Sequence, residues 1–279
     1  MKNLLLLFLV ATSFTLNAQK DAYQFYMNLN KISNDLIQVQ LTTPSITQES
    51  IIYNIPKIVP GTYSIYDFGK YVVDFEAFDK DGKPLVVNRL DDNRWQIERS
   101  TSLSSISYWV EDTWDAEEDN FVFEPGGTNI EERENVVLNN HGFFGYFDGM
   151  KHLKYEVNVT RPENFYGTTG LTTVTTNGNV DQFTTENYMD LVDAPIMYNV
   201  PDTTTFIVGG AEILISVYSK NKAATAIELG TDIKKILELQ KEYLGGTLPV
   251  DKYAFIIYLY EGQSGSGGSG ALEHSYSSF

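Results

Sequence analysis

The chain has 279 residues, with 20 Lys and Arg against 37 Asp and Glu and a formal net charge of −17 at pH 7. This acidic balance argues against a nucleic-acid-binding protein and against electrostatic docking on anionic lipid, because both need a basic face. The sequence contains no cysteine, which excludes disulfides, thiolate metal sites and cysteine nucleophiles, while 42 % hydrophobic residues are enough for a folded core.

The first residues predict export. The basic Lys2 precedes an apolar run, Leu4–Val10, and a small and polar stretch follows up to Ala18. This order is typical of a secretory signal peptide, and we expect residues 1–18 to be removed by cleavage after Ala18. The run is much shorter than the ~20 residues that span a bilayer, and we predict no membrane span later in the chain. The mature protein is therefore expected to be periplasmic or secreted.

From Tyr23 to about Pro201 the pattern predicts a mostly β fold. Alternation of apolar and polar residues indicates strands at 36–41, 70–78, 95–97, 106–110 and 153–159. The segment Asp79-Lys80-Asp81-Gly82 predicts a hairpin turn in which Asp-Gly supplies positive φ angles. Many short strands separated by turn signals favour a β-sandwich, which we assign to residues 19–200.

After residue 201 the pattern changes. We expect strands at 205–208 and 212–218, a helix at 223–244 that Gly245-Gly246 ends, and a strand at 253–260. The apolar side chains of the helix recur at three- and four-residue steps. The last strand is almost wholly apolar, as is typical of a strand covered on both faces. The order β-β-α-β predicts a second unit over residues 201–279, with a boundary near residues 199–204.

Some motifs are better interpreted as structural. Gly265–Gly270 satisfies G-x-G-x-x-G, but the residues that follow supply neither the helix nor the acid of a dinucleotide site, so we predict a flexible loop. The acidic run 111–119 does not match an EF-hand and is expected to be a solvated loop. His141 and His152 are predicted to be structural or surface residues. The sequence contains neither His-Glu-x-x-His nor Gly-x-Ser-x-Gly.

One stretch points to a known family. Residues 56–68 read Pro-Lys-Ile-Val-Pro-Gly-Thr-Tyr-Ser-Ile-Tyr-Asp-Phe. This resembles the P-x-x-x-P-G-x-Y-x-x-x-D-F signature of the glycyl aminopeptidases, metallopeptidase family 61. Further segments resemble the family in the same order along the chain: Phe75–Asp79 with Gly82, Trp95–Ile97, Ser107–Val110, Gly170-Leu171, Leu191–Ile196, and Gly270–His274 with Ser277.

The resemblance implies a β-sandwich that packs on a thermolysin-like catalytic domain. Residues 201–279 would then be the incomplete start of this α+β domain. By analogy with the related aminopeptidase N enzymes, Gly270-Ala271-Leu272-Glu273 would lie on an edge strand of the substrate cleft. The backbone at Gly270 and Ala271 would approach the peptide closely, and Glu273 would pair with the free α-amine of the peptide N-terminus.

The zinc site of the family is expected beyond Phe279. There, a His-Glu-x-x-His motif and a later glutamate hold the metal and supply the general base. We therefore expect no catalytic residue, no metal ligand and no cofactor in this chain, and zinc in a full-length relative. In the family fold, further helices normally cover the sheet formed by residues 205–279. We expect these helices to be missing here, so that Phe255, Ile257 and Leu259 are partly exposed.

Two functions follow as hypotheses. The first is the N-terminal portion of an exported zinc aminopeptidase that favours small N-terminal residues such as Gly and Ala, and that is inactive as this chain. The second is a non-catalytic exported β-sandwich module that binds peptide, protein or glycan through exposed aromatic residues and an acidic surface.

Overall fold

The computed structural model describes residues 21–115, 122–172, 174–260 and 270–279. The predicted signal peptide and most of the Gly265–Gly270 segment lie outside these residues. Strands make up 44 % and helices 16 %, so the fold is mostly β, as the sequence predicts. No helix in the described part of the chain is both long and apolar enough to cross a membrane.

A seven-stranded sheet forms one layer of the N-terminal unit. Its strands, in spatial order, are β13 (Val174–Asn177), β14 (Val180–Thr185), β11 (Lys154–Thr160), β1 (Ala22–Asn28), β2 (Leu36–Thr42), β7 (Leu103–Glu111) and β4 (Val72–Asp79). The alternation seen in the sequence sets the faces of these strands, because successive side chains point to opposite sides of a sheet. In β2, Ile37, Val39 and Leu41 are buried.

Two four-stranded sheets form the opposite layer of a sandwich. One contains β10 (Tyr146–Phe147), β3 (Ser50–Asn54), β6 (Arg94–Glu98) and β5 (Val87–Asp91), and the other contains β12 (Tyr166–Thr169), β15 (Ile196–Asn199), β9 (Asn135–Leu138) and β8 (Asn129–Glu131). Buried tyrosines join the layers. The hydroxyls of Tyr53 and Tyr108 are 3.1 Å apart, and the N–H of Phe147 donates to the Tyr23 hydroxyl at 2.9 Å. The layers therefore share one aromatic-rich core.

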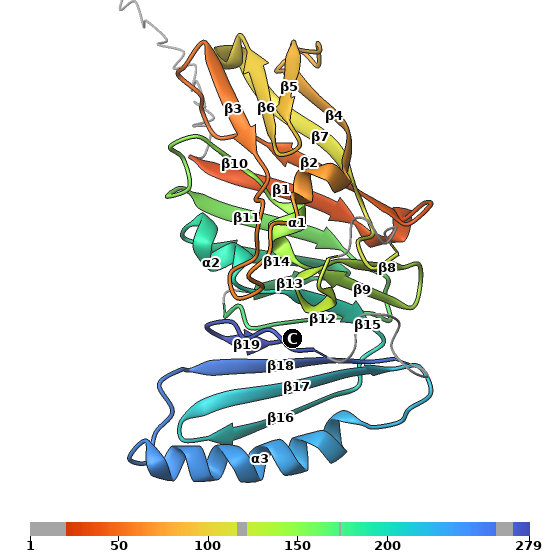
Figure 1. Ribbon diagram of the computed structural model, residues 1–279, viewed down its shortest axis with the longest axis vertical. Helices are drawn as coiled ribbons and strands as arrows, with labels where there is room; N and C mark the ends of the chain where they lie inside the picture. Colours follow the sequence, from red (N-terminus) through yellow and green to blue (C-terminus); the bar gives the residue numbers. More distant parts are fainter. Residues whose placement is uncertain (1–20, 116–121, 173, 261–269) are drawn as a thin grey trace, which may run out of the picture.

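A fourth sheet and one long helix follow the sandwich. The sheet has the order β16 (Thr203–Val208), β17 (Ala211–Ser219), β18 (Lys252–Leu259) and β19 (Ser277–Ser278), and α3 spans Ala226–Tyr243. Figure 1 shows α3 running along β16, whereas β19 lies on the side of the sheet that is nearest the sandwich. The sheet joins the sandwich through an apolar interface, in which Val137 and Met197 meet Leu214, Ala254 and Ile256.

The other helices in the described parts of the chain are short and belong to the sandwich. They are α1 (Asn140–Phe143), α2 (Tyr188–Val192) and the 3-10 helices η1 (Leu29–Lys31), η2 (Phe68–Tyr71), η3 (Ser100–Ser102) and η5 (Glu124–Gly126). Short sequences of this kind carry no helical periodicity, and none of these helices is predicted from the sequence. The predicted domain boundary near residues 199–204 stays a prediction.

The predicted hairpin turn forms, but with one difference. The N–H of Gly82 donates to the carbonyl of Asp79 at 3.0 Å, and the chain turns back to place Pro84 opposite Phe78. Gly82 has a φ of 76°, whereas Asp81 is not among the described residues with positive φ. The glycine alone therefore supplies the left-handed conformation of this turn.

The predicted strands at 205–208 and 212–218 and the predicted helix are present, but the contact face of α3 differs from its apolar pattern. Of its apolar side chains, Leu237 is buried, whereas Ile227 is 68 % and Ile236 56 % exposed. The helix approaches the sheet closely at Gly230, where a Cβ would lie 2.8 Å from Cγ2 of Thr204. This close approach decides which face of α3 is covered.

The strand β18 is also covered less than its sequence suggests. One face, with Ala254 and Ile256, packs against the sandwich. On the other face Phe255, Ile257 and Leu259 are only partly buried, as predicted for these three side chains. The expectation of cover on both faces is therefore wrong, because α3 packs mainly on β16 and β17.

Candidate functional site

Residues 270–279 form a β-hairpin at the edge of the fourth sheet. The N–H of Leu272 donates to the carbonyl of Phe279 at 2.7 Å, and the N–H of Phe279 donates back to Leu272 at 3.0 Å. The N–H of His274 closes the turn on the carbonyl of Ser277 at 2.8 Å. The second arm, β19, pairs in parallel with β18, so the first arm is the outermost strand. An edge of this kind can pair with an extended peptide.

The strand register fixes the face on which Glu273 lies. Glu273 is opposite Ser278 in the hairpin, and Ser278 is opposite Phe255 in β18. Residues paired in this way point to the same side of a sheet, so Glu273 shares the half-covered face of Phe255. Its neighbour Leu272 points the other way and is buried against the sandwich. Glu273 itself is exposed.

Glycines of the sandwich let its backbone approach this hairpin. A Cβ at Gly61 would lie 3.0 Å from Cδ1 of Leu272, and a Cβ at Gly170 would lie 2.4 Å from the carbonyl oxygen of Tyr276. A Cβ at Gly270, within the hairpin, would lie 2.5 Å from the ring of Phe123. Side chains at these positions would push the hairpin away from the sandwich.

Asp193 makes a further contact with the hairpin, at its turn. The carboxylate accepts from Nδ1 of His274 at 3.2 Å and from the N–H of Ser275 at 3.1 Å. Gly61, Gly170 and Asp193 belong to three segments that resemble the glycyl aminopeptidases, and Gly270–His274 is the fourth. Segments that are separate in the sequence thus meet at one hairpin.

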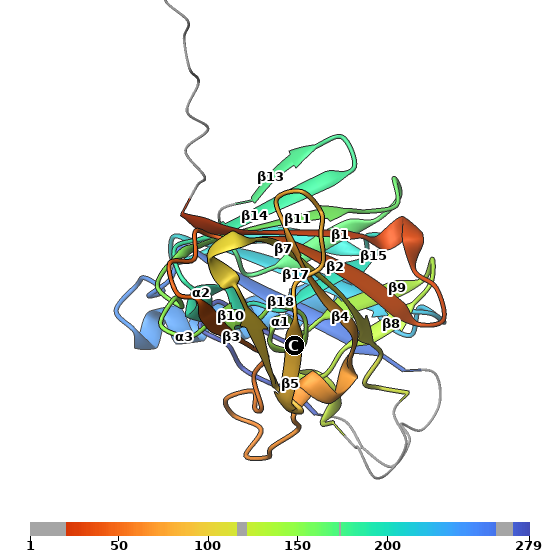
Figure 2. The same ribbon diagram turned by 90° about the horizontal axis from the view of Figure 1, so that it is seen from above.

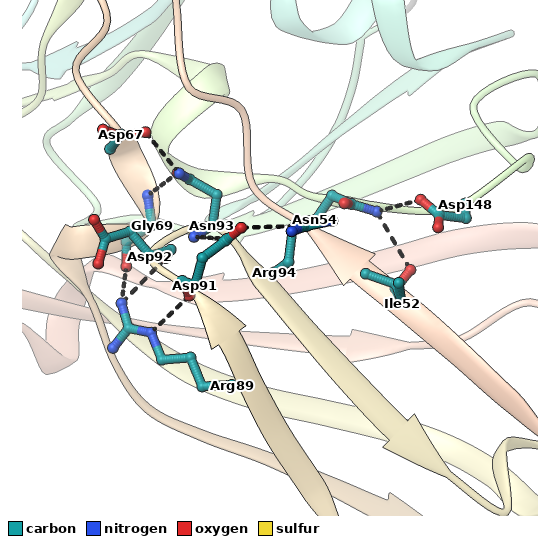
Figure 3. Close-up of polar contacts among 10 residues, drawn as sticks. All are labelled: Ile52, Asn54, Asp67, Gly69, Arg89, Asp91, Asp92, Asn93, Arg94 and Asp148. Carbon is teal, nitrogen blue, oxygen red and sulfur yellow. Dashed lines mark hydrogen bonds and ion pairs between the residues drawn. The ribbon is translucent and has the colours of Figure 1, made fainter.

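A polar clamp holds the signature loop, residues 55–68. Asn93 donates through Nδ2 to Asp67 at 2.8 Å and accepts at Oδ1 from the N–H of Gly69 at 3.0 Å (Figure 3). Arg89 donates to the carbonyls of Gly69 and Asp92, and Asp91 accepts from the N–H of Asn93 (Figure 3). The Asp-Phe-Gly end of the signature is therefore fastened to the turn between β5 and β6.

The polar clamp holds the end of the signature loop at Asp67, and the rest of the loop extends toward the hairpin. In Figure 1 the orange segment after β3 descends beside α1 toward β19, and Figure 2 places it on the opposite side of the molecule from β13 and β14. Tyr63 and Ile65 in this loop are 95 % and 70 % exposed. Tyr63 also has a φ of 58°, a conformation that costs free energy in a non-glycine residue.

A groove of about 650 Å³ lies beside the hairpin. Its lining includes Trp114, Glu124, Tyr258, Tyr260, Gly270 and Ala271. The rings of Trp114 and Tyr258 meet edge to face at 4.9 Å, and Nε1 of Trp114 donates to the carbonyl of Glu124 at 2.9 Å. Burial, with a smaller effect of Glu124, raises the pKa of Tyr260. The predicted residues Gly270 and Ala271 line this groove, whereas Glu273 does not.

The two histidines predicted to be structural or surface residues have those positions. His141 is buried in α1, where burial, followed by the charge of His274, lowers its pKa to about 4. His152 is exposed. Within residues 21–115, 122–172, 174–260 and 270–279, no group of three or more His, Asp or Glu is placed to hold a metal ion. The described residues therefore do not fit a catalytic zinc.

Part of the acidic run 111–119 is buried and does not form the solvated loop that the sequence predicts. Asp112 is buried, and its carboxylate accepts from the N–H groups of Trp114 at 2.7 Å and of Ile130. Burial raises the pKa of this carboxyl to about 6. The carboxylate thus fastens β8 to the segment that carries Trp114, a role that an exposed acidic run would not suggest. Residues 116–121 lie outside the described residues.

Three residues of this site are not predicted by the sequence patterns: Asn93, Asp193 and Glu124. Asp193 lies within a segment already matched to the family, which is the signal that could have found it. Asn93 and Glu124 carry no such signal, because their roles depend on contacts between distant parts of the chain.

Comparisons with known proteins agree with the architecture. A structure of an aminopeptidase N family protein from Idiomarina loihiensis matches with a TM-score of 0.78 and 23 % identity, over 92 % of this chain and 41 % of its own. An M1 zinc metallopeptidase variant from Deinococcus radiodurans, bound to a Tyr-Ser-Ala substrate, matches with a TM-score of 0.51 and 12 % identity. That match covers 94 % of this chain and 60 % of the other. No curated protein matches the sequence.

At 23 % and 12 % identity, these structural matches show a shared fold. The family model of the Peptidase M61 N-terminal domain matches residues 24–199, and the chain belongs to this family. The match begins within β1 and runs to the last residue of β15, so it covers nearly all of the sandwich. The chain spans less than half the length of the Idiomarina loihiensis protein.

Proposed function

We propose that this chain is the N-terminal portion of an exported zinc aminopeptidase, and that its C-terminal hairpin binds the N-terminus of the substrate peptide. The observation that carries this proposal is the meeting of four family-like segments at the hairpin, through Gly61, Gly170, Asp193 and Gly270. Such a meeting supports a shared site, because scattered structural motifs have no reason to gather around one exposed edge.

Each part of the hairpin has a role in this proposal. The backbone of Glu273, which faces the outer edge of the hairpin, pairs with the extended backbone of the peptide. Glu273 accepts the ammonium group of the peptide, which gives a charge-assisted hydrogen bond at a fixed distance from the first peptide bond. The small residues Gly270 and Ala271 let the peptide backbone come close. Small N-terminal residues such as Gly and Ala are the proposed preference.

Zinc would supply the activated water for hydrolysis in a full-length relative. The described residues offer no three-ligand group for it, and we assign no hydrolytic step to them. We therefore propose that the purified chain binds no stoichiometric zinc and does not turn over Gly-p-nitroanilide. Zinc retained through dialysis together with turnover would contradict this part of the proposal.

Peptide binding tests the role of Glu273. The tripeptide Gly-Ala-Ala with a free amine should bind the chain more tightly than its N-acetylated form in isothermal titration calorimetry. Glu273→Gln should weaken binding of the free-amine peptide about tenfold and leave the acetylated peptide unaffected, because it removes only the charged acceptor. The matched control is Glu76→Gln, an exposed glutamate in β4. Equal affinities for the two peptides would overturn the proposal.

A non-catalytic binding module is the second candidate, and the aromatic groove beside the hairpin favours it. Trp114, Tyr258 and Tyr260 are side chains on which an apolar peptide or a sugar ring can stack. A module of this kind would bind without dependence on Glu273 or on a free amine. The genomic sequence after the codon for Phe279 separates the two candidates, since an in-frame His-Glu-x-x-His favours the enzyme.

Export is also a proposal. It rests on the leader-like order of the basic Lys2, the apolar run Leu4–Val10 and the small Ala18. N-terminal sequencing of the protein from a periplasmic or culture fraction should begin at Gln19. Recovery of the chain with its first residues intact in the cytoplasmic fraction alone would contradict export.

A further inference from the structure

Asp193 holds the turn of the hairpin at two points. It follows α2 directly, and its carboxylate accepts from the Nδ1–H of His274 and from the N–H of Ser275, at 3.2 and 3.1 Å. One bond is to a side chain and the other is to the backbone of the next residue. A bidentate grip of this kind fixes the direction of the turn as well as its distance.

The charges around this contact agree with an ionised carboxylate. Burial acts to raise the pKa of Asp193, but the hydrogen bonds from His274 and Ser275 outweigh it, and the pKa lies below its ordinary value. The ionised carboxylate can only accept, so Nδ1 of His274 carries the proton. The ring of His274 is 3 % exposed, and its Nε2 has no hydrogen-bond partner among the described residues.

Among the described residues, Asp193 is therefore the one hydrogen-bond partner of the buried ring. The nearby His141 stays neutral near pH 7, because burial lowers its pKa to about 4. A ring nitrogen left without a partner costs free energy. Burial of the His274 ring with Nε2 unpaired in the described part of the chain therefore costs free energy, and the hydrogen bond from Nδ1 to Asp193 offsets that cost.

The grip on His274 determines where Glu273 points. Successive residues of a strand face opposite sides, so fixing the ring of His274 against the sandwich fixes Glu273 on the other side. Leu272, buried against the loop at Gly61, supports the same register. A slip of one residue would turn Glu273 inward and expose His274.

We propose that Asp193 is a positioning residue: it fixes the register of the hairpin so that Glu273 presents its carboxylate to the peptide amine. Asp193 does not contact the peptide and acts through His274 and Ser275. This inference rests on the proposed function for its last step, whereas the grip on the hairpin can be tested independently.

Hydrogen exchange tests the grip. In Asp193→Ala the amides of Leu272, His274 and Phe279 should exchange about tenfold faster or more, because the turn loses a charged hydrogen bond. Asp193→Asn keeps one acceptor and should show a smaller effect in the same amides. The amide of Ile215 in β17 should be unchanged, which separates local release from global unfolding. The control is Asp190→Asn, an exposed aspartate in α2. Unchanged exchange in the hairpin would overturn the inference.

A double-mutant cycle tests whether Asp193 acts through Glu273. Asp193→Ala should weaken binding of free-amine Gly-Ala-Ala about tenfold, and should have no further effect when Glu273→Gln is already present. A merely structural role would weaken binding equally in both backgrounds, which would overturn the positioning role. If Glu273→Gln alone leaves binding unchanged, the proposed function fails and the positioning role fails with it. The hydrogen-exchange result then still decides whether Asp193 anchors the hairpin.

Discussion

A single buried amide, that of Asn93, joins the signature loop to the turn between β5 and β6. It is 2 % exposed, and it satisfies both the carboxylate of Asp67 and the backbone N–H of Gly69. At Gly69 a Cβ would lie 2.1 Å from the carbonyl oxygen of Asp92, so the two segments are in direct backbone contact. The signature residue Asp67 and the adjacent Gly69 thus have a structural role.

Removing this amide should destabilise the protein. Asn93→Ala leaves the buried N–H of Gly69 without its acceptor and removes one partner of the half-buried Asp67 carboxylate, which keeps its ion pair with Lys70 at 3.8 Å. We expect a loss of about 2 kcal/mol in the free energy of unfolding. Urea-induced unfolding measures the change. Asn88→Ala, which removes an exposed hydrogen bond to Glu98, is the control and should cost less than about 0.5 kcal/mol. Similar losses in the two variants would contradict the clamp.

The carboxyl of Asp112 makes stability depend on pH. Its pKa in the folded chain is about 6, raised by burial from an ordinary value of 3.8. Because the folded-state pKa is the higher one, the stability it contributes is complete below the unfolded pKa and is lost as pH rises through about 6.

Asp112→Asn replaces the carboxyl with an amide that does not titrate, and its stability is compared with that of the natural chain. The difference in the free energy of unfolding, natural chain minus variant, should be larger by about 2 kcal/mol at pH 4.5 than at pH 7.5. Urea titrations at the two pH values measure it. A difference that is independent of pH, or that grows with rising pH, would show that burial does not raise the pKa of Asp112.

At the scale of elements, α3 begins at a capping box. The hydroxyl of Thr225 accepts from the N–H of Glu228 at 3.4 Å, and the Glu228 carboxylate accepts from the N–H of Thr225 at 2.9 Å. Asp202, just before β16, also accepts from the N–H of Ala226 at 3.1 Å. The start of the helix is therefore fixed both locally and by the sheet, which explains why α3 begins three residues later than its apolar pattern suggests.

The contribution of the capping box to the stability of the protein should be measurable. Thr225→Ala removes the acceptor for an otherwise unpaired helix N–H, and we expect a loss of about 1 kcal/mol in the free energy of unfolding. Thr231→Ala is the matched control inside the same helix, since its exposed hydroxyl only donates back to the carbonyl of Ile227. That change should be neutral to within about 0.5 kcal/mol. Equal effects of the two substitutions would mean that the box contributes nothing.

At the scale of the whole molecule, the sandwich carries almost all of its own core. Among the buried residues of that core, only Leu272 comes from beyond Tyr198. The fourth sheet has a separate, smaller core beneath α3. The two are joined by the apolar interface at Val137 and Met197 and by the contacts of the hairpin, so removal of the sheet would leave most of the core of the sandwich covered.

Limited proteolysis should therefore remove the C-terminal quarter first. We expect cleavage near residues 199–204 and a resistant fragment of ~180 residues, because the sandwich buries its own apolar surface. Time-resolved digestion with mass analysis of the fragments measures this. The same digestion of the Asn93→Ala variant provides a comparison in which the sandwich itself is weakened. Loss of the sandwich before the C-terminal quarter would contradict the predicted boundary.

Much of the fold could be predicted because its information is local. Alternating residues such as Ile37, Val39 and Leu41 mark a half-buried strand without reference to any partner. The apolar residues of α3 predict a helix for the same reason, but not its contact face. Ile227 and Ile236 are exposed because Gly230 sets the closest approach to the sheet. The distance between the helix and the sheet depends on the contact of Gly230 with Thr204, which lies in β16 and is remote from α3 in the sequence.

The sequence by itself determined that the protein is mostly β, that its charge is wrong for nucleic acid, and which family its segments between residues 56 and 277 resemble. That resemblance also implied an edge position for Glu273, Gly270 and Ala271, whose motif is contiguous and so can be recognised in the sequence. Only the tertiary structure brought Gly61, Gly170 and Asp193 to the same hairpin. The physical reason is that strand patterns arise from neighbouring residues, whereas the meeting of Asp193 with His274, 81 residues further on, depends on how the sheets are stacked.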